Sequence, residues 1–272
     1  MFKWLLLFAG AGLFYLWLKK KKQAKFDQEN AGKTQPNKAR TPIEPEAMVQ
    51  CQYCKVHLPQ SAAIAHEHRF YCSNEHLNNL DQHGWIGNAA WRVSPNKDAR
   101  PEGINPDVLV IHHISLPPGE FKNQASSRYI VDFFQNKLDP TAHSYFAEIA
   151  DQKVSSHFLI TRAGECIQFV STQDRAWHAG ASSFLGRERC NDFSIGIELE
   201  GDGDTPFDDV QYTALANLVQ QLSASYPNLQ FAGHSDIAPE RKTDPGKYFD
   251  WIKFQKETGI STEKLPYGLV SR

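Results

Sequence analysis

The sequence predicts an α/β domain over residues 84–265, preceded by three smaller segments. Two apolar runs, Val108–Ile111 and Phe193–Leu199, have the length and the β-branched content of buried strands. Residues 208–224 repeat apolar side chains at the spacing of one helix face and open on acidic residues. With 272 residues, of which 41 % are hydrophobic, the chain can bury a full core and still carry appendages. These patterns are typical of a globular α/β domain.

Shorter elements are predicted between the two strands. Residues 127–135 and 141–150 have helical composition. Residues 157–160 and 166–170 predict the two strands of a β-hairpin, with Gly164 in the turn. No internal repeat interrupts this order of elements.

Net charge and cysteine content exclude two classes of protein. The formal net charge of -2 provides no broad attraction to nucleic acid, and the lysine-rich stretch is confined to the N-terminus. The five cysteines are an odd number; three lie in one short segment, whereas Cys166 and Cys190 are far from it. A secreted disulfide framework is therefore excluded, and a reducing compartment fits the chain better. No nucleic-acid partner is expected.

The first segment, residues 1–22, is predicted to be a membrane anchor with a basic stop. Residues 4–18 carry no charge and are flanked by Lys3 and by four lysines at 19–22. As a helix this stretch rises about 23 Å, less than the roughly 30 Å of a bilayer core. Lysine and tryptophan side chains at both ends would extend its reach to the two interfaces.

A cleavable signal peptide is the alternative for this segment. Such peptides carry positive charge before the apolar stretch and a small-residue cleavage site after it, whereas here the lysine block follows the apolar stretch. The positive-inside rule places a block of this kind in the cytoplasm. We therefore expect a single-pass protein of the inner (cytoplasmic) membrane that binds the membrane through its N-terminal helix, with its main domain facing the cytoplasm.

A flexible linker and a small metal-binding module are predicted next. Residues 23–49 are rich in lysine, glutamine, asparagine and proline, with few apolar side chains, so they cannot form a core. Residues 50–80 then contain a cysteine pair separated by two residues, and a cysteine and a histidine separated by three: Cys51, Cys54, Cys72 and His76. Three thiolates and one imidazole form the closed ligand set of a structural zinc site.

Other assignments stay open for this module. Its cysteines could be free thiols with incidental spacing, and His57, His66 or His68 could replace His76 as the fourth ligand. The segment from Phe70 to His76, together with the preceding helix, basic stop and linker, resembles a small zinc-finger module found on short membrane-anchored bacterial proteins. That resemblance implies a structural role.

The main domain contains a second set of candidate metal ligands. His112 follows the first apolar strand, and His234 and Asp244 lie in one short loop. Zinc hydrolases hold the ion with three protein ligands and leave one position for water, whose pKa falls to roughly 7. A single histidine at a strand end is more often a hydrogen-bonded core residue, so only the combination indicates a metal hydrolase.

Three neighbouring positions have two interpretations each. Because adjacent strand residues point to opposite faces, only one of His112 and His113 can face the site, and spacing does not choose between them. Glu198 ends an apolar strand and is either a general base or a structural carboxylate. Lys242 either stabilises an oxyanion or lies on the surface, as most lysines do.

Four longer motifs occur in order along the main domain: Val110–His112 leading into Ile114–Phe121, Arg175–Gly180, Gly186–Gly201 and Gly233–Gly246. With them, residues 84 to about 254 resemble the AmpD-type N-acetylmuramoyl-L-alanine amidases, the zinc amidases related to peptidoglycan recognition proteins. The resemblance implies a mixed β-sheet flanked by helices, with one catalytic zinc in a groove.

The same resemblance implies roles for single residues. The family's zinc ligands correspond to His112, His234 and Asp244, its catalytic glutamate to Glu198 and its oxyanion-stabilising lysine to Lys242. This favours His112 over the adjacent histidine, where the family commonly has asparagine. The family's substrate groove lies near blocks that contain four further residues: Trp177, His178, Arg189 and Asn191. The tryptophan among them is equally compatible with a core position.

Members of the family cleave the amide between N-acetylmuramic acid, favouring its 1,6-anhydro form, and L-alanine of muropeptides during cell-wall recycling. The resemblance implies this activity and a muropeptide substrate for the chain. Three alternatives stay open: an amidase in the periplasm that acts on intact peptidoglycan, a non-catalytic peptidoglycan-binding module, and a chain whose metal module recruits a protein partner. The complete ligand set argues against a module that only binds.

Overall fold

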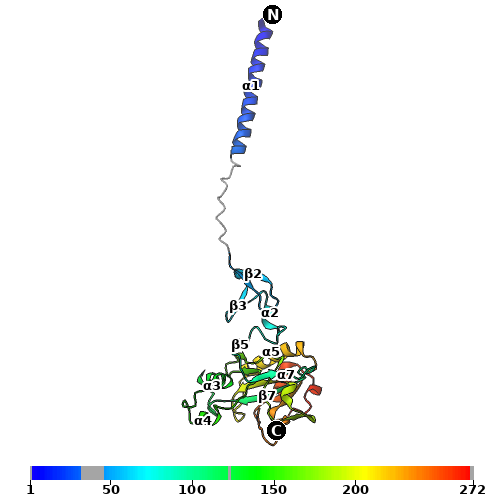
Figure 1. Ribbon diagram of the computed structural model, residues 1–272. Helices are drawn as coiled ribbons and strands as arrows, with labels where there is room; N and C mark the ends of the chain where they lie inside the picture. The colour runs from blue at the N-terminus through cyan, green and yellow to red at the C-terminus, as the bar shows by residue number, and fades with distance from the viewer. Residues whose placement is uncertain (1, 32–45, 122–123, 270–272) are drawn as a thin grey trace. The chain divides into compact units, whose positions relative to one another are not determined.

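The computed structural model describes residues 2–31, 46–121 and 124–269, and the chain divides into two compact units, Met1–Ala47 and Met48–Arg272 (Figure 1). In its described residues the first unit is one helix, α1 (Phe2–Ala31). The side chains described for this helix, from residue 14 to residue 28, are all exposed.

Helix α1 includes more of the chain than the predicted anchor. It continues through the lysine block at residues 19–22 and into the range predicted as linker, where lysine, glutamine and glutamate have good helix propensity. The later part of the predicted linker, residues 32–45, lies outside the described residues.

No helix within the described ranges is long and apolar enough to cross a membrane. This finding overturns the predicted single-pass location in the inner membrane with the main domain facing the cytoplasm, and membrane binding through α1 is not supported. The physical reason is length. The uncharged stretch ends at Leu18, where about 23 Å of helix falls short of a bilayer core of roughly 30 Å, and lysines occupy the following turn.

The second unit begins with residues 48–80, which we name the cysteine module. Its elements are β1 (Met48–Gln50), β2 (His57–Pro59), the 3-10 turn η1 (Gln60–Ala62), β3 (Ile64–His66), β4 (Arg69–Tyr71) and α2 (Asn74–Asn78). Strand β1 pairs antiparallel with β2, and β3 pairs antiparallel with β4. The Ser73 hydroxyl caps α2 by accepting a hydrogen bond of 3.2 Å from the backbone N–H of His76.

A six-stranded mixed sheet forms the centre of the second unit. Its strands are β5 (Ala90–Trp91), β7 (Val108–Ile114), β8 (Phe158–Ile160), β9 (Cys166–Gln168), β13 (Ser194–Glu200) and β14 (Gln230–Gly233). They lie in the spatial order β14-β7-β13-β8-β9-β5, so β14 and β5 are the edges. Neighbouring strands are parallel except β8 and β9, which form an antiparallel hairpin. The mixed sheet and the hairpin expected from the sequence are confirmed.

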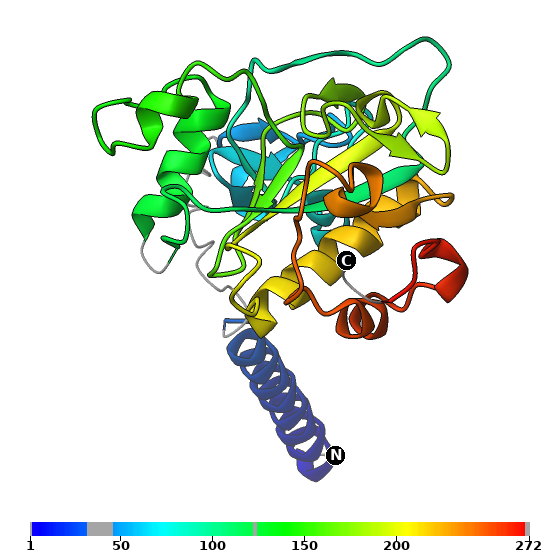
Figure 2. The ribbon, with the colours of Figure 1, turned by 90° about the horizontal axis from the view of Figure 1, so that it is seen from below.

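Helices flank the sheet, and short strand pairs lie beside it. The helices are α3 (Gln124–Phe134), α4 (Phe146–Ile149), α5 (Asp209–Ser225), α6 (His234–Ile237) and α7 (Trp251–Thr258), with the 3-10 turns η2 (Cys190–Asp192) and η3 (Thr262–Lys264). Two pairs are antiparallel: β6 (Lys97–Ala99) with β10 (Asp174–Ala176), and β11 (Ser183–Phe184) with β12 (Arg187–Glu188). Figure 2 shows α5, in yellow, along one face of the sheet, with α3 and α4, in green, to one side.

Two predicted helices differ in their outcome. Helix α5 spans Asp209–Ser225, close to the predicted range of 208–224. Helix α4 is much shorter than the predicted range of 141–150. The side chain of Asp139 accepts a hydrogen bond of 2.8 Å from the backbone N–H of Thr141, and a turn of this kind competes with helix formation.

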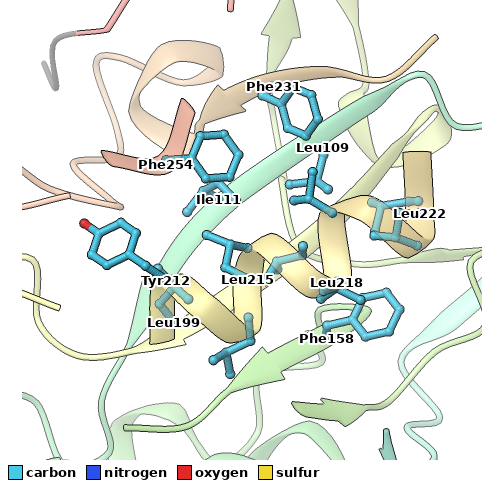
Figure 3. Packing of buried hydrophobic residues seen from close by; sticks show 14 of the residues in the cluster. Leu109, Ile111, Phe158, Leu199, Tyr212, Leu215, Leu218, Leu222, Phe231 and Phe254 are labelled. Atoms are coloured by element: carbon cyan, nitrogen blue, oxygen red, sulfur yellow. The ribbon is translucent and has the colours of Figure 1, made fainter. Parts of the chain in front are cut away.

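The largest apolar core lies between α5 and the sheet (Figure 3). Leu109 and Ile111 of β7 are fully buried there against the apolar row of α5, which includes Leu215, Leu218 and Leu222. Burial of each side chain of this size contributes about 1.5–3 kcal/mol relative to its exposure.

The same packing decides where the histidines of β7 point. Strand residues alternate between faces, and Leu109 and Ile111 face α5. Val108 and Val110 belong to a separate cluster on the other face, and His112 continues their series. The apolar residues of β7 therefore direct His112 away from the α5 core.

Candidate active site

The ends of three parallel strands bring the candidate ligands together. His112 lies near the carboxyl end of β7, and Glu198 lies beside it on β13, where the two residues are paired in register. His234 begins α6 directly after β14, and Asp244 lies in the loop that follows. Functional residues at the carboxyl ends of parallel strands are the common arrangement in α/β sheets.

Three ligand atoms form a nearly equilateral triangle. Nδ1 of His112, Nδ1 of His234 and Oδ2 of Asp244 lie 2.9 Å from one another. Atoms bound tetrahedrally to zinc at about 2.0–2.1 Å would lie roughly 3.3 Å apart, so only a slight opening of the triangle is needed. Two imidazoles and one carboxylate leave a fourth position open, as in catalytic zinc sites. The donor set fits zinc.

Nε2 of His234 lies 3.1 Å from the carbonyl oxygen of Ala179. A carbonyl oxygen only accepts, so Nε2–H donates, and the lone pair of Nδ1 is left for the metal. Nε2 of His112 lies 2.9 Å from Nδ1 of His178, where either nitrogen could donate.

Ser194 decides the direction of that contact. Its hydroxyl donates to the carbonyl oxygen of Cys190 at 2.5 Å, so its oxygen accepts Nε2–H of His178 at 3.1 Å. Nδ1 of His178 is then an acceptor, and Nε2–H of His112 donates to it. The lone pair on Nδ1 of His112 is left for the metal. We name Ser194, His178 and His112 the positioning chain.

Close packing holds His178 in place. Oδ1 of Asn191 accepts hydrogen bonds from the backbone N–H groups of His178 and Ala179, at 3.1 and 2.8 Å. Gly196 lies against the ring of His178, where an added Cβ would come within 2.5 Å of it. Only glycine leaves room for the ring at this position of β13.

Burial controls the protonation of the ligands. It lowers the pKa of His112 to about 4, and the charge of His234 contributes in the same direction. Burial raises the pKa of Asp244, but its close contacts with the two histidines outweigh that effect and hold its pKa below the usual range. At neutral pH the site therefore offers an uncharged His112 imidazole and an ionised Asp244, the forms that bind a metal.

Glu198 is buried beside the triangle and is only 9 % exposed. Its Oε2 atom has no hydrogen-bond partner in the part of the chain that the structure describes. Burial raises the pKa of its carboxyl well above the usual value, the charge of Asp244 raises it further, and the charge of Lys242 opposes both. A carboxylate with a raised pKa and an unused oxygen has the properties of a general base.

Lys242 and His113 have different surroundings. Lys242 is half-buried, and its charge acts on the pKa of both Glu198 and His112, so its ammonium is within electrostatic reach of the triangle. The ring of His113 instead lies against Gly203, where an added Cβ would be 2.7 Å from it. Burial lowers the pKa of His113. Of the two adjacent histidines, the structure brings His112 to the triangle.

The four residues expected near a substrate groove have different surroundings. Arg189 is exposed and pairs with a neighbouring aspartate at 3.1 Å. The indole N–H of Trp177 donates to Asp98 at 3.1 Å. His178 contacts the candidate ligand His112 on β7, and Asn191 accepts a hydrogen bond from the backbone of His178. Two of the four residues are therefore engaged with the support of the ligands.

Sequence reasoning missed Ser194 and the residue beneath it, Arg100. Arg100 donates to the carbonyl oxygen of Ser194 at 2.8 Å, and burial lowers its pKa to about 10. A signal for Ser194 was present. Ser194, Gly196 and Glu198 alternate along one predicted strand, so a hydroxyl and a position without a side chain share the face of the glutamate. That pattern leaves space for a further side chain, which is His178.

A second group of residues that could hold a metal ion lies in the cysteine module. Sγ of Cys54 and Sγ of Cys72 are 3.8 Å apart, and Nδ1 of His76 lies 3.8 Å from Sγ of Cys51 and 3.0 Å from Sγ of Cys72. Thiolates bound tetrahedrally to zinc at about 2.3 Å would be roughly 3.8 Å apart, so this group also fits zinc. Within the described residues the group does not include the three other histidines of the module: His57, His66 and His68.

Known proteins share most of the second unit. The family model for N-acetylmuramoyl-L-alanine amidase matches residues 102–247. The 1,6-anhydro-N-acetylmuramyl-L-alanine amidase AmpD of Enterobacter cloacae is 50 % identical over 187 residues, which cover 68 % of this chain and 98 % of that relative. The AmpD enzyme of Escherichia coli strain K12 is 50 % identical over 178 residues, which cover 65 % of this chain and 95 % of the relative.

A solved structure extends the likeness to the fold. The crystal structure of a selenomethionine AmpD derivative has 50 % sequence identity and a TM-score of 0.62, and it covers 65 % of this chain and 97 % of that chain. The family match contains the ligand triangle and both candidate catalytic residues, and it begins after the cysteine module. More than half of the chain lies within a match to zinc-dependent amide hydrolases, so the chain belongs to the N-acetylmuramoyl-L-alanine amidase family and is an enzyme of that class.

Proposed function

We propose that this amidase acts on muropeptides that carry 1,6-anhydro-N-acetylmuramic acid and releases the peptide by hydrolysing its bond to L-alanine, in cell-wall recycling. The relatives that are named for this substrate are about half identical to the chain over nearly their whole length. The observation that carries the proposal is the triangle of ligand atoms with the unpartnered oxygen of Glu198 beside it.

The three atoms of the triangle are assigned to a catalytic zinc. His112 and His234 would each bind it through Nδ1, and Asp244 would bind it through Oδ2. When bound, zinc supplies a Lewis acid and lowers the pKa of water to roughly 7. The positioning chain and the carbonyl oxygen of Ala179 keep both imidazoles in the tautomer that this binding requires.

Glu198 and Lys242 are assigned to the chemical step. Glu198 takes a proton from the attacking water and later gives it to the leaving amine, a contribution of roughly 100- to 10,000-fold in rate. Its raised pKa brings the carboxyl closer to neutral pH, where one group can perform both transfers. The Lys242 ammonium stabilises the negative charge on the carbonyl oxygen, and the loss of one such donor costs about 100- to 1,000-fold.

The substrate-binding role is divided between two kinds of residue. Arg189 is exposed and Trp177 is half-buried, so both have surface with which to contact a muropeptide. We assign His178 to the orientation of the ligand His112. We assign Asn191 to holding the backbone of the loop that carries His178 and Ala179.

The full-length chain should be incubated with anhydro-muropeptide and, separately, with intact sacculi, with released peptide measured by mass spectrometry. We expect release from the anhydro-muropeptide, loss of release with a chelator and recovery with added zinc. Release mainly from sacculi would instead identify an amidase of intact peptidoglycan. Binding without release from either substrate would identify a module that only binds peptidoglycan.

We also propose that residues 50–80 hold a structural zinc through four ligands: Cys51, Cys54, Cys72 and His76. The four ligand atoms lie within 4.8 Å of one another, which supports the assignment. Full-length protein is then expected to bind two zinc ions, and Cys72→Ser is expected to bind one. Unchanged metal content in Cys72→Ser would reject this second site. Recruitment of a protein partner by the module remains the alternative role for it.

A further inference from the structure

The cysteine module contacts the edge of the amidase sheet. Strand β5 is an edge strand and pairs on one side with β9. On its other side lie residues of the β3–β4 hairpin. Exposed edge strands present unpaired N–H and C=O groups that promote pairing with another chain, so proteins usually cover or interrupt them.

Two side chains of the hairpin bind the backbone at this edge. The carboxylate of Glu67 accepts a hydrogen bond of 3.3 Å from the backbone N–H of Trp91. The guanidinium of Arg69 donates to the carbonyl oxygen of Ala89 at 2.8 Å. One donor and one acceptor of the edge are thereby satisfied by the module.

Charge and an aromatic ring strengthen the same contact. The guanidinium carbon of Arg69 lies 3.8 Å from the centre of the Trp91 ring, and the Arg69 side chain is only 12 % exposed. Glu67 forms ion pairs with Arg92 at 3.1 Å and with Arg69 at 3.6 Å. Glu67 and His68 connect the two strands of the hairpin with positive φ values of 43° and 65°, as a tight type I′ turn requires, and this turn brings the Glu67 carboxylate to the edge.

Tyr71 brings the module into direct contact with the chain before β5. Its ring is 1 % exposed. A Cβ added to Gly87 would lie 2.8 Å from the Tyr71 ring and 2.4 Å from the carbonyl oxygen of Leu77. The two parts therefore meet at a distance that only glycine permits.

Strand β4 connects this contact to the metal ligands. Arg69 and Tyr71 are on β4, and Cys72 follows directly. Cys51 forms an isolated β-bridge with Phe70 of the same strand. Next to this bridge, the backbone N–H of Gln52 donates to the carbonyl oxygen of Phe70 at 2.8 Å. Two-stranded hairpins are marginal alone, so ligands on both sides of β4 would fix its position.

We propose that the cysteine module is a metal-dependent cap on the β5 edge of the amidase sheet. The part of this chain that covers the edge is the β3–β4 hairpin of the module. The proposal rests on the zinc site assigned to Cys51, Cys54, Cys72 and His76. Metal bound there would order β4 and the turn before it, which place Arg69 and Glu67 on the edge. Loss of that metal therefore loosens β5 although the catalytic ligands are untouched.

Two variants of the full-length chain separate the metal from the contact. Cys54→Ser removes an exposed ligand, and Arg69→Met removes the donor and cation while keeping an apolar stem. Matched controls are His57→Gln, exposed in the module and outside the ligand group, and Arg128→Met, whose side chain is 81 % exposed on α3. Each protein is measured for bound zinc, thermal midpoint and hydrogen exchange of the amides at residues 86–92.

Cys54→Ser is expected to lose one zinc, to unfold at a temperature lower by about 4 °C or more, and to exchange faster at residues 86–92. Arg69→Met is expected to keep both zinc ions and to show the same faster exchange. Combining the two changes should give less than the sum of their separate effects, because they act on one contact. The controls are expected to behave as the unaltered chain does.

The outcomes distinguish this proposal from the zinc assignment on which it rests. If Cys54→Ser keeps both zinc ions, the assignment fails, and Arg69→Met still reports on the contact. If Cys54→Ser loses a zinc while the thermal midpoint and exchange at residues 86–92 stay unchanged, the cap is rejected and the zinc site stands. Unchanged exchange in Arg69→Met would likewise reject the cap.

Discussion

Nε2 of His112 donates to Nδ1 of His178 across 2.9 Å, and this hydrogen bond determines which nitrogen of the ligand is available to a metal. It links a candidate metal ligand on β7 to a loop residue distant in sequence. Partners of this kind hold the tautomer and the ring orientation of metal-binding histidines. His178 thus acts through His112, as a positioning residue.

Replacing His178 tests that role. Asparagine places an amide oxygen close to the position of Nδ1, so His178→Asn is expected to keep an acceptor for His112 and to retain most zinc affinity. His178→Leu leaves Nε2–H of His112 without an acceptor, and its zinc affinity is expected to fall by about 10- to 100-fold. Competition with a chelator measures the affinity, and the spectrum of the cobalt-substituted site reports ligand geometry. Equal zinc affinity in the asparagine and leucine variants would contradict the role.

Replacing Glu198 separates metal binding from chemistry. Glu198→Gln keeps the size of the side chain and removes the base, so kcat on anhydro-muropeptide is expected to fall by roughly 100- to 10,000-fold. Catalytic-site zinc should stay, since the carboxylate is outside the ligand triangle. Metal content and turnover should be measured on the same preparation. Turnover close to that of the unaltered chain would remove Glu198 from the mechanism.

The acid limb of the pH profile is expected to report Glu198. A base must be unprotonated, so kcat/KM falls as the pH drops through its pKa, and the raised pKa moves this loss above that of an ordinary glutamate near about 4.3. The pKa of His112 is lowered to about 4, so its protonation begins only at more acidic pH. Activity and bound zinc should be followed together; parallel loss of both would assign the limb to the ligands instead.

The strand pattern predicted much of this site. Apolar runs located β7 and β13, and the residues that end them, His112 and Glu198, are adjacent in the sheet. Spacing alone could not choose between His112 and His113, because that choice depends on which face of β7 packs against α5. The family resemblance favoured His112, and the burial of Leu109 and Ile111 against α5 supplies the physical reason.

Contacts between segments that are distant in the sequence could not be predicted from local sequence patterns. The positioning chain requires Ser194 and His178 from separate elements, and the cap requires Arg69 of the cysteine module to meet Trp91 of β5. Neither pair has a periodicity or a spacing that marks it. The prediction of a membrane anchor was wrong for a different reason. The apolar stretch is shorter than a bilayer core, and the prediction relied on flanking lysine and tryptophan side chains to extend its reach.

Replacing Lys242 tests both of its assigned effects. Lys242→Met is expected to lower kcat by about 100- to 1,000-fold through loss of oxyanion stabilisation, with catalytic zinc retained. The lysine charge lowers the pKa of Glu198, so its removal should also move the acid limb of kcat/KM to higher pH. Lys247→Met is the matched control, since its side chain is 67 % exposed. Removing a positive charge raises the pKa of any carboxylate that the charge stabilises. A fall in kcat without a shift of the acid limb would therefore show that Lys242 acts on the substrate but not on the base.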